Sequence, residues 1–405
     1  MNNNNYWDVL KHPIVARLTL IQLISYFGTW FSQVAIASMM LEYGASELAI
    51  AYIFMMLMLP AIVLAPISGW IIDKVSFKKL MGILLLIEIS MTLLFMTVNS
   101  LSDINALMLF VFIRSAAASI LFAAEMALFP KILKGDMLKK TNEIHSIVWS
   151  VCFASGMALG GLVTYYFGYD ITFLIDVILY SIAFVLLLGL KLSLKPVKHT
   201  ESALKMMKSG FLYLKNHKKL IHLIILHATI GFTSFETLIT LLADLHYKYI
   251  LAIPLAIGWI NATRALAMTI GPLLFSKYIN DKNIHYFFAL QGFAIILWAF
   301  MQQNYSVSIL GIFIVGLLST SLWSYTYYML QQEIEEKYLG RVIAYNDMIF
   351  MIFNILVTLF VGYAAKMGME LKYITIIMGC GFIATAFYYQ WFKKNYLLNL
   401  DDKSV

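Results

Sequence analysis

Among the charged residues that lie within long apolar runs of this sequence are Glu88, Arg114, Asp176, Glu236 and Arg264. An arginine at the centre of a membrane helix costs about 2.5–3.5 kcal/mol on the insertion scale unless it is paired or hydrated. Arg114 therefore requires an acidic partner, and Glu88 and Asp176 are both candidates. Glu236 and Arg264 are expected to pair with each other. Burial raises the pKa of a carboxyl group, and a neighbouring arginine lowers it. The protonation of such a group can therefore change when its surroundings change. Glu236, beside Arg264, is thus a candidate to bind and release a proton. The alternative for each arginine is an ion pair that only fastens helices.

Aromatic residues with a few polar neighbours suit an amphipathic organic ligand. The aromatic and polar candidates for a ligand cavity are Tyr26, Trp30, Gln33, Trp323 and Tyr327. Ordinary packing remains the alternative, because aromatic residues make up 15% of the chain. His222 and His227 are interpreted as packing residues, with a role in proton transfer as the alternative.

Other kinds of site find no support in the sequence. It contains no metal-ligand spacing, phosphate-binding loop or nucleophile elbow, so no metal, no cofactor and no enzyme activity are expected. The net charge of +7 does not indicate nucleic acid, because the basic residues occupy short gaps between apolar runs. Cys152 and Cys380 lie inside apolar runs and are expected to be small buried residues.

The elements that must position these residues are membrane-spanning helices. The chain of 405 residues is 61% hydrophobic and 13% charged, against about 25% charged in a typical soluble domain. Apolar runs of about 20 residues, the length that crosses a bilayer, recur along it. The predicted spans are 16–41, 46–72, 80–98, 104–127, 144–167, 170–191, 219–244, 252–278, 285–301, 306–330, 343–365 and 371–392.

The basic residues orient these spans. With both termini in the cytoplasm, 24 of the 29 lysines and arginines lie in or beside inner segments. Lys248, Lys366 and Lys372 lie in outer loops, and Arg114 and Arg264 lie within spans. Because inner loops are enriched in lysine and arginine, the sequence predicts a multi-pass protein of the cytoplasmic (inner) membrane with both termini inside.

The largest inner segment divides the chain into an N-terminal bundle (1–191), a basic linker (192–218) and a C-terminal bundle (219–405). Leu204, Met207, Phe211 and Leu212 recur at helical spacing among lysines of the linker. This pattern predicts a short amphipathic helix on the anionic inner leaflet, with a solvated linker as the alternative.

The loop after the second span carries Gly69, Asp73, Lys74 and Lys78. This spacing of a glycine, an acid four residues later and then basic residues resembles the signature of the major facilitator superfamily, although Ser76 and Phe77 depart from it. Asp73 is expected to cap the inner end of the eleventh span.

The resemblance implies twelve helices in two pseudo-symmetric six-helix bundles. It also implies that Arg114 in the fourth span faces the cavity and is tied to proton coupling, which makes Glu88 and Asp176 coupling candidates too. Spans seven and eight line the cavity in this superfamily, so Glu236 and Arg264 are further cavity candidates.

Further segments resemble one branch of this superfamily. Gly156, Gly160 and Gly161 in the fifth span resemble the antiporter signature of exporters, with Met157 in place of its proline. Glycines on one face also simply permit close helix packing. The segments 25–31, 129–130 and 340–342 are similar to the branch of the enterobactin exporter, macrolide efflux proteins and the lysophospholipid transporter. Many of those proteins have an acid at the position of Thr29.

The resemblance implies secondary transport by alternating access. The expected activity is proton-coupled export of a small amphipathic molecule of the drug or siderophore type by a monomer among membrane lipids. A transporter of a lipid-like molecule or a metabolite, working inward or between leaflets, is the alternative. A membrane-embedded sensor or enzyme is a more remote one.

Overall fold

The computed structural model describes residues 6–191 and 203–397, which form helices and turns without a β-strand. Ten segments in this part of the chain are long and apolar enough to cross a membrane. One of them holds two predicted spans, 144–167 and 170–191. The predicted span 80–98 corresponds to a further helix, α4 (Phe77–Phe95), which carries Lys78, Lys79 and Glu88. Together these account for all twelve predicted spans.

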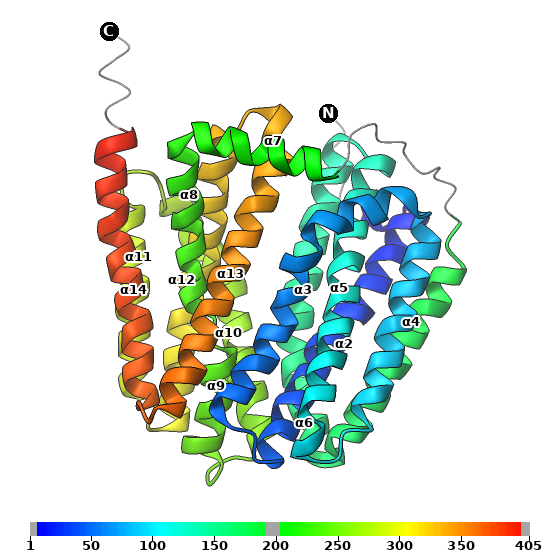
Figure 1. The fold of residues 1–405 in the computed structure, drawn as a ribbon, viewed down its shortest axis with the longest axis vertical. Helices are drawn as coiled ribbons and strands as arrows, with labels where there is room; N and C mark the ends of the chain where they lie inside the picture. Colours follow the sequence, from blue (N-terminus) through cyan, green and yellow to red (C-terminus); the bar gives the residue numbers. More distant parts are fainter. Residues whose placement is uncertain (1–5, 192–202, 398–405) are drawn as a thin grey trace. The chain divides into compact units, whose positions relative to one another are not determined.

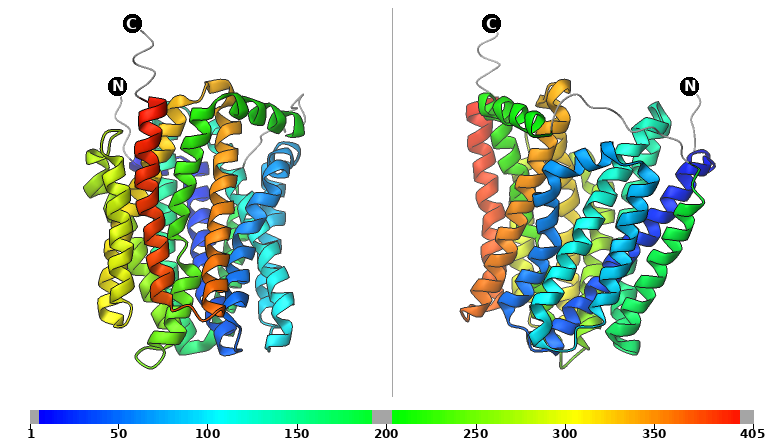
Figure 2. Two further views of the ribbon diagram at one scale, coloured as in Figure 1. Left: turned by 60° about the vertical axis from the view of Figure 1, so that its left-hand side comes forward. Right: turned by 45° about the vertical axis from the view of Figure 1, so that its right-hand side comes forward.

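Contacts divide the chain into two compact units, and in each the long helices run side by side (Figures 1 and 2). Unit 1 comprises the described residues within Met1–Ala45, Met56–Ala203 and Ala252–Ala262. Its helices are α1 (Tyr6–Leu10), α2 (Pro13–Glu42), most of α3 (Glu47–Lys74), α4, α5 (Ile104–Ile132) and α6 (Gly135–Leu188), with the short turn η1 (Leu101–Asp103).

Unit 2 comprises the described residues within Ser46–Met55, Leu204–Leu251 and Thr263–Val405. Its elements are α7 (Ala203–Asn216), α8 (Lys218–Ala228), η2 (Thr229–Thr233), α9 (Glu236–Leu242), η3 (Ala243–Tyr247), the second half of α10 (Ile253–Phe275), η4 (Ser276–Tyr278), α11 (Ile284–Met301), α12 (Tyr305–Glu333), η5 (Glu336–Tyr338), α13 (Leu339–Lys366), α14 (Leu371–Phe392) and η6 (Lys393–Leu397).

Helix α6 is interrupted at one residue, Gly168, in the two-residue gap between the fifth and sixth predicted spans. Gly168 has φ 79° and ψ 170°, a conformation outside the helical region. Glycine reaches positive φ without the penalty that a Cβ imposes. The chain can therefore reverse direction at Gly168 with no longer loop.

The seventh predicted span, 219–244, is present as a candidate membrane span, Lys218–Tyr247, but its helix is interrupted. Helix α8 ends at Ala228, a 3-10 turn covers Thr229–Thr233, and Ser234 has ψ 78°. The Thr229 and Thr233 hydroxyls donate to the carbonyls of Leu226 and Ile230. Threonine and serine compete in this way with the backbone for hydrogen bonds, which weakens a helix. A broken helix at membrane depth is tolerated where protein buries it.

Helix α7 lies across the ends of α8 and α13 within unit 2 (Figure 1). The Tyr213 ring stacks on Tyr338 at 4.2 Å, and Arg341 donates to the Ser209 hydroxyl at 2.6 Å. Phe211 and Leu212, by contrast, are exposed. The linker therefore contains a helix, and its position on the inner leaflet stays a prediction.

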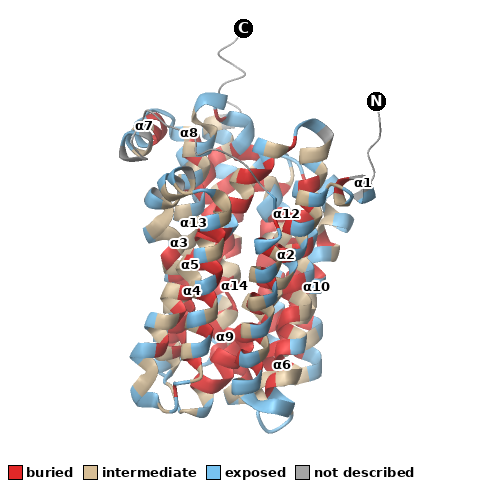
Figure 3. Ribbon diagram, turned by 90° about the vertical axis from the view of Figure 1, so that its right-hand side faces the viewer, coloured by how far each residue is buried: buried red, intermediate tan, exposed pale blue. Residues whose placement is uncertain are grey.

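Exposed residues lie along the outer faces of the helices (Figure 3), and many of them are large and apolar, such as Leu109 and Val185. Cys152 is buried, as expected, but Cys380 is exposed, so the expectation for Cys380 is wrong. Helices in lipid are apolar on their inner and outer faces alike, so an apolar run does not reveal which face is covered.

Candidate functional site

Arg114 is the centre of a buried polar cluster in unit 1. Its guanidinium donates from Nη1 to the Ser32 hydroxyl at 2.8 Å. Nη2 donates to Asp176 Oδ2 and to the Tyr180 hydroxyl, each at 2.9 Å. The side-chain exposures of Arg114 and Asp176 are 7% and 0%. Helices α2, α5 and α6 thus each contribute to one ion pair and its hydrogen bonds.

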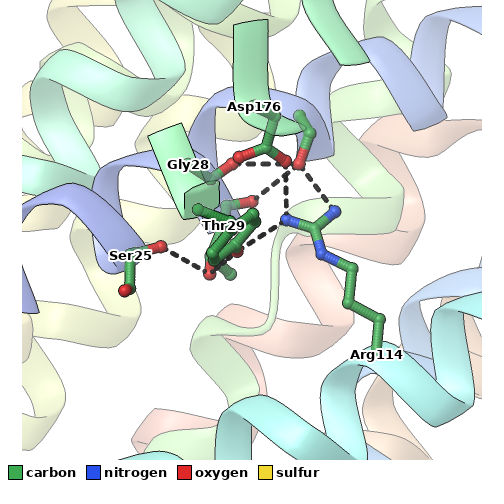
Figure 4. Close-up of polar contacts among 7 residues, drawn as sticks. Ser25, Gly28, Thr29, Arg114 and Asp176 are labelled. Atoms are coloured by element: carbon green, nitrogen blue, oxygen red, sulfur yellow. Dashed lines mark hydrogen bonds and ion pairs between the residues drawn. The ribbon is translucent and has the colours of Figure 1, made fainter. Parts of the chain in front are cut away.

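Helix α2 is shaped to receive this ion pair. Gly28 lies beside Asp176 (Figure 4), and a Cβ at Gly28 would stand 2.1 Å from Asp176 Oδ1. The Thr29 hydroxyl lies 2.9 Å from the Tyr180 hydroxyl and donates to the Ser25 carbonyl at 3.0 Å. Thr29, which stands where many relatives of the predicted branch have an acid, therefore contacts Arg114 indirectly through Tyr180.

Glu88, the other acid proposed for Arg114, is not its ion-pair partner. It is 1% exposed, and its Oε2 has no hydrogen-bond partner. Its charge interacts with those of Arg114 and Asp176 across a longer distance. Of the two acids, Asp176 holds the arginine because it lies opposite on α6, within hydrogen-bonding distance.

The structure adds an acid that the sequence analysis missed. Glu125, on α5, is fully buried, and its Oε2 accepts a hydrogen bond from the Tyr26 hydroxyl at 2.9 Å. Tyr26, proposed as a substrate-cavity residue, is thus engaged with Glu125. An acid inside an apolar run was the signal that would have found Glu125, because ionisable residues at membrane depth are rare and functional by default.

Arg264 and Glu236 pair in unit 2, as expected. Arg264 Nη1 donates to Glu236 Oε1 at 3.0 Å, and Nη2 donates to the Thr233 carbonyl at 2.8 Å. That carbonyl belongs to η2, where the helix is interrupted. Glu236 is the first residue of α9, directly after the break. The interruption therefore supplies a backbone acceptor for the arginine, which a continuous helix would use internally.

Trp323 and Tyr327 form an aromatic group around His227 within unit 2. Their rings stack at 4.9 Å and lie 5.5 and 5.4 Å from the imidazole. His227 Nδ1 lies 2.8 Å from the Thr326 hydroxyl, and its buried Nε2 has no partner. Such a group combines apolar surface with an unsatisfied polar atom, and its contact with substrate stays a prediction.

The glycines of the fifth span pack in unit 1. A Cβ at Gly156 would lie 2.8 Å from Trp30 Cβ, and one at Gly160 would lie 2.3 Å from the Phe31 carbonyl oxygen. A Cβ at Gly161 would meet the Pro254 carbonyl at 2.5 Å. These positions account for the glycines by close helix packing. Their role in export stays a prediction, as does substrate contact by Trp30 and by the buried Gln33.

The loop motif is only partly described. Lys78 Nζ donates to the carbonyls of Leu188 and Leu190 at 2.6 and 3.2 Å, at the end of α6, where a basic side chain is favoured. Lys74 lies over the Trp70 ring at 5.0 Å. The surroundings of Gly69 and the side chain of Asp73 lie outside the described part of the structure, so the cap by Asp73 stays a prediction.

A family model described as Major Facilitator Superfamily matches residues 18–358. The chain belongs to this superfamily. Its fold resembles the nucleoside transporter NupG, with a TM-score of 0.76 at 15% identity over 94% of this chain and 99% of that one. It also resembles the POT family transporter PepTSo, with a TM-score of 0.74 at 11% identity over 95% and 98% of the two chains.

A curated relative, the staphyloferrin A transporter of Staphylococcus aureus (strain NCTC 8325 / PS 47), is 22% identical over 334 residues. This match covers 79% of the present chain and 81% of the relative. The prediction of an all-helical membrane protein with the fold of this superfamily is confirmed. The chain is a multi-pass secondary transporter and not an enzyme.

Proposed function

We propose that this transporter exports a small amphipathic organic molecule of the siderophore type across the cytoplasmic membrane, in exchange for protons. The relation to a staphyloferrin A transporter supports the substrate class. The glycine pattern of the fifth span, which resembles the signature of exporters, supports the direction. Both termini lie in the cytoplasm, as the lysine and arginine distribution predicts.

The proposal of proton coupling rests on the buried ion pair of Arg114 and Asp176, in which Nη2 and Oδ2 lie 2.9 Å apart. Asp176 Oδ1 has no hydrogen-bond partner, so one oxygen of this carboxyl is open to a proton. Protonation of Asp176 removes the charge that holds Arg114, which then rests on the Ser32 and Tyr180 hydroxyls alone. A changed contact between α5 and α6 is the step through which a proton alters the substrate cavity.

Glu236 provides a second coupling candidate in unit 2. Its Oε1 accepts from Arg264, while Oε2 has no partner. Because Glu236 begins α9 directly after the helix break, protonation there loosens the link between α9 and α10. The proposed contacts with substrate are Trp323 and Tyr327, whose stacked rings suit an amphipathic ligand.

Two measurements test the proposal. A strain that lacks the protein should accumulate a siderophore inside the cell and release less of it, as followed by mass spectrometry of cells and medium. Purified protein in liposomes should move staphyloferrin A against its gradient when a pH gradient is imposed. Unchanged siderophore release by the deleted strain, with a changed lipid or metabolite content, would favour the alternative transporter of such molecules.

A further inference from the structure

The core of unit 1 contains more buried polar atoms than its ion pair explains. In the described part of the chain, buried atoms without hydrogen-bond partners include Gln22 Nε2, Ser25 Oγ, Glu88 Oε2, Glu125 Oε1 and both ring nitrogens of His145. Buried polar groups are paired in most native structures, and an exception points to a function or to water. These atoms lie on α2, α4, α5 and α6, all of them helices of unit 1.

Glu125 stands apart from the ion pair of unit 1. Its carboxyl group is fully buried, and it forms no ion pair with a described residue. The Tyr26 hydroxyl donates to Oε2 at 2.9 Å, which leaves Oε1 without a partner. A charge buried without a counter-charge is costly in an apolar medium, and a proton on the group removes that cost. Glu125 has the geometry of an acid that binds and releases a proton.

The groups that face Glu125 come from each helix packed around it. Tyr26 on α2 holds Oε2, and the His145 ring on α6 lies edge-on to the Tyr26 ring at 5.7 Å. Glu88 on α4 interacts electrostatically with Glu125 and also with Arg114 and Asp176. No cation among these groups opposes protonation of Glu125 by pairing with its carboxylate.

One face of α2 joins the two polar sites. Gln22, Tyr26, Thr29 and Gln33 recur at intervals of three or four residues, so they share a face of the helix. Tyr26 bonds to Glu125, and Thr29 bonds to Tyr180 of the Arg114 cluster. The three residues from Tyr26 to Thr29 rise about 4.5 Å along the helix.

We infer that Glu125 and Tyr26 form a proton-binding site in unit 1, separate from the Arg114–Asp176 ion pair, and that Glu88 and the polar face of α2 connect the two. The proton comes from water and forms an O–H bond on Glu125 Oε1. That bond breaks when the proton leaves, so no other reactant is needed. The part of this site in transport rests on the proton coupling proposed above, whereas proton binding itself does not.

Infrared difference spectroscopy of the purified full chain, between acidic and alkaline buffer, tests the site without any substrate. The wild-type protein should show a carboxylic acid C=O band that Glu125→Gln removes, because an amide does not titrate. Tyr26→Phe should move this band to higher frequency, because the carbonyl loses its hydrogen bond. Thr164→Val removes another buried hydroxyl, which lies 3.0 Å from Thr172, and should leave the band unchanged.

A spectrum that Glu125→Gln and Tyr26→Phe both leave unchanged would overturn the inference. If Glu125→Gln does not fold, the shift caused by Tyr26→Phe decides it, since glutamate is then intact. In liposomes, Glu125→Gln should exchange staphyloferrin A at equal pH but lose accumulation driven by a pH gradient. The wild-type protein could instead show no accumulation driven by a pH gradient while Glu125 still titrates in the infrared spectrum. That pair of results would refute proton-coupled transport, and the proton-binding site would remain supported.

Discussion

Two arginines inside predicted spans, Arg114 in unit 1 and Arg264 in unit 2, are satisfied by different means. Both are 6% exposed, and each has one acidic partner at hydrogen-bonding distance. Arg114 takes its other bonds from the side chains of Ser32 on α2 and Tyr180 on α6, and it uses no backbone carbonyl of the described residues. Arg264 takes its other bond from the Thr233 carbonyl, which a broken helix releases.

The two ion pairs also differ in how deeply their acidic side chains are buried. Asp176 is completely buried, whereas the Glu236 side chain is 14% exposed. Removing one partner of a fully buried pair leaves a charge that is enclosed by apolar protein, whereas removing one partner of a partly exposed pair leaves a charge that is less enclosed. We therefore expect unit 1 to depend on its ion pair for folding more than unit 2 does.

The largest effect is expected from Arg114→Leu. It leaves Asp176 buried without a cation, which is expected to destabilise the protein by about 3–5 kcal/mol. The measurement is the thermal midpoint of purified protein, together with the yield of monodisperse protein in detergent. The neutral pair Arg114→Gln with Asp176→Asn should recover most of the yield, and a single variant as stable as wild type would contradict the comparison.

Arg264→Leu should reduce stability less, because Glu236 is partly exposed. The neutral pair Glu236→Gln with Arg264→Gln should fold, since no unpaired charge remains. It should lose transport driven by a pH gradient in liposomes if Glu236 carries a proton. Wild-type transport by this double variant would assign the pair a structural role and leave coupling to unit 1.

Gly28→Ala sharpens the comparison because it disturbs the Arg114 site without changing a charge. The added Cβ would stand 2.1 Å from Asp176 Oδ1, so the carboxyl must move away from the arginine. Overpacking of this kind costs about 1–3 kcal/mol. Gly82→Ala, whose nearest atom would be 3.6 Å away, is the matched control and should leave the thermal midpoint near that of wild type.

The smallest perturbation tests the predicted orientation of the chain, with both termini in the cytoplasm. In a background without Cys152 and Cys380, a cysteine in place of the exposed Tyr249 should react with an impermeant thiol reagent from outside. A cysteine in place of the exposed Lys215, on α7, should not react in intact cells. Labelling in the opposite pattern would invert the topology.

Much of the fold could be predicted from the sequence, because each membrane helix appears in it as a long apolar run. Runs of about 20 apolar residues placed all twelve spans, since a helix must cross the hydrocarbon core. The break at η2 escaped this reasoning, because Thr229, Gly231 and Ser234 are apolar or small enough to continue an apolar run. Hydropathy measures how a segment partitions into lipid, and it is insensitive to whether its backbone is helical.

The candidate site was predicted in part. The cost of an unpaired charge showed that Arg114 needs an acid, and the sequence narrowed the choice to two. Choosing between Glu88 and Asp176 required knowing that Asp176 lies 2.9 Å away, beside a glycine that makes room for it. Glu125 carried the same signal as the other acids, and its partnership with Tyr26 depends on how α2 and α5 face each other.

Composition and periodicity alone determined that this chain spans a membrane many times and that its few interior charges must be neutralised. Both follow from the free energy of moving single groups from water into hydrocarbon, which depends on residue type and depth. Which acid meets which arginine, and which face of α2 is polar toward its neighbours, was decided by tertiary structure. Those contacts arise between helices far apart in the chain, where rotation of a helix by one residue points a side chain toward lipid instead of its partner.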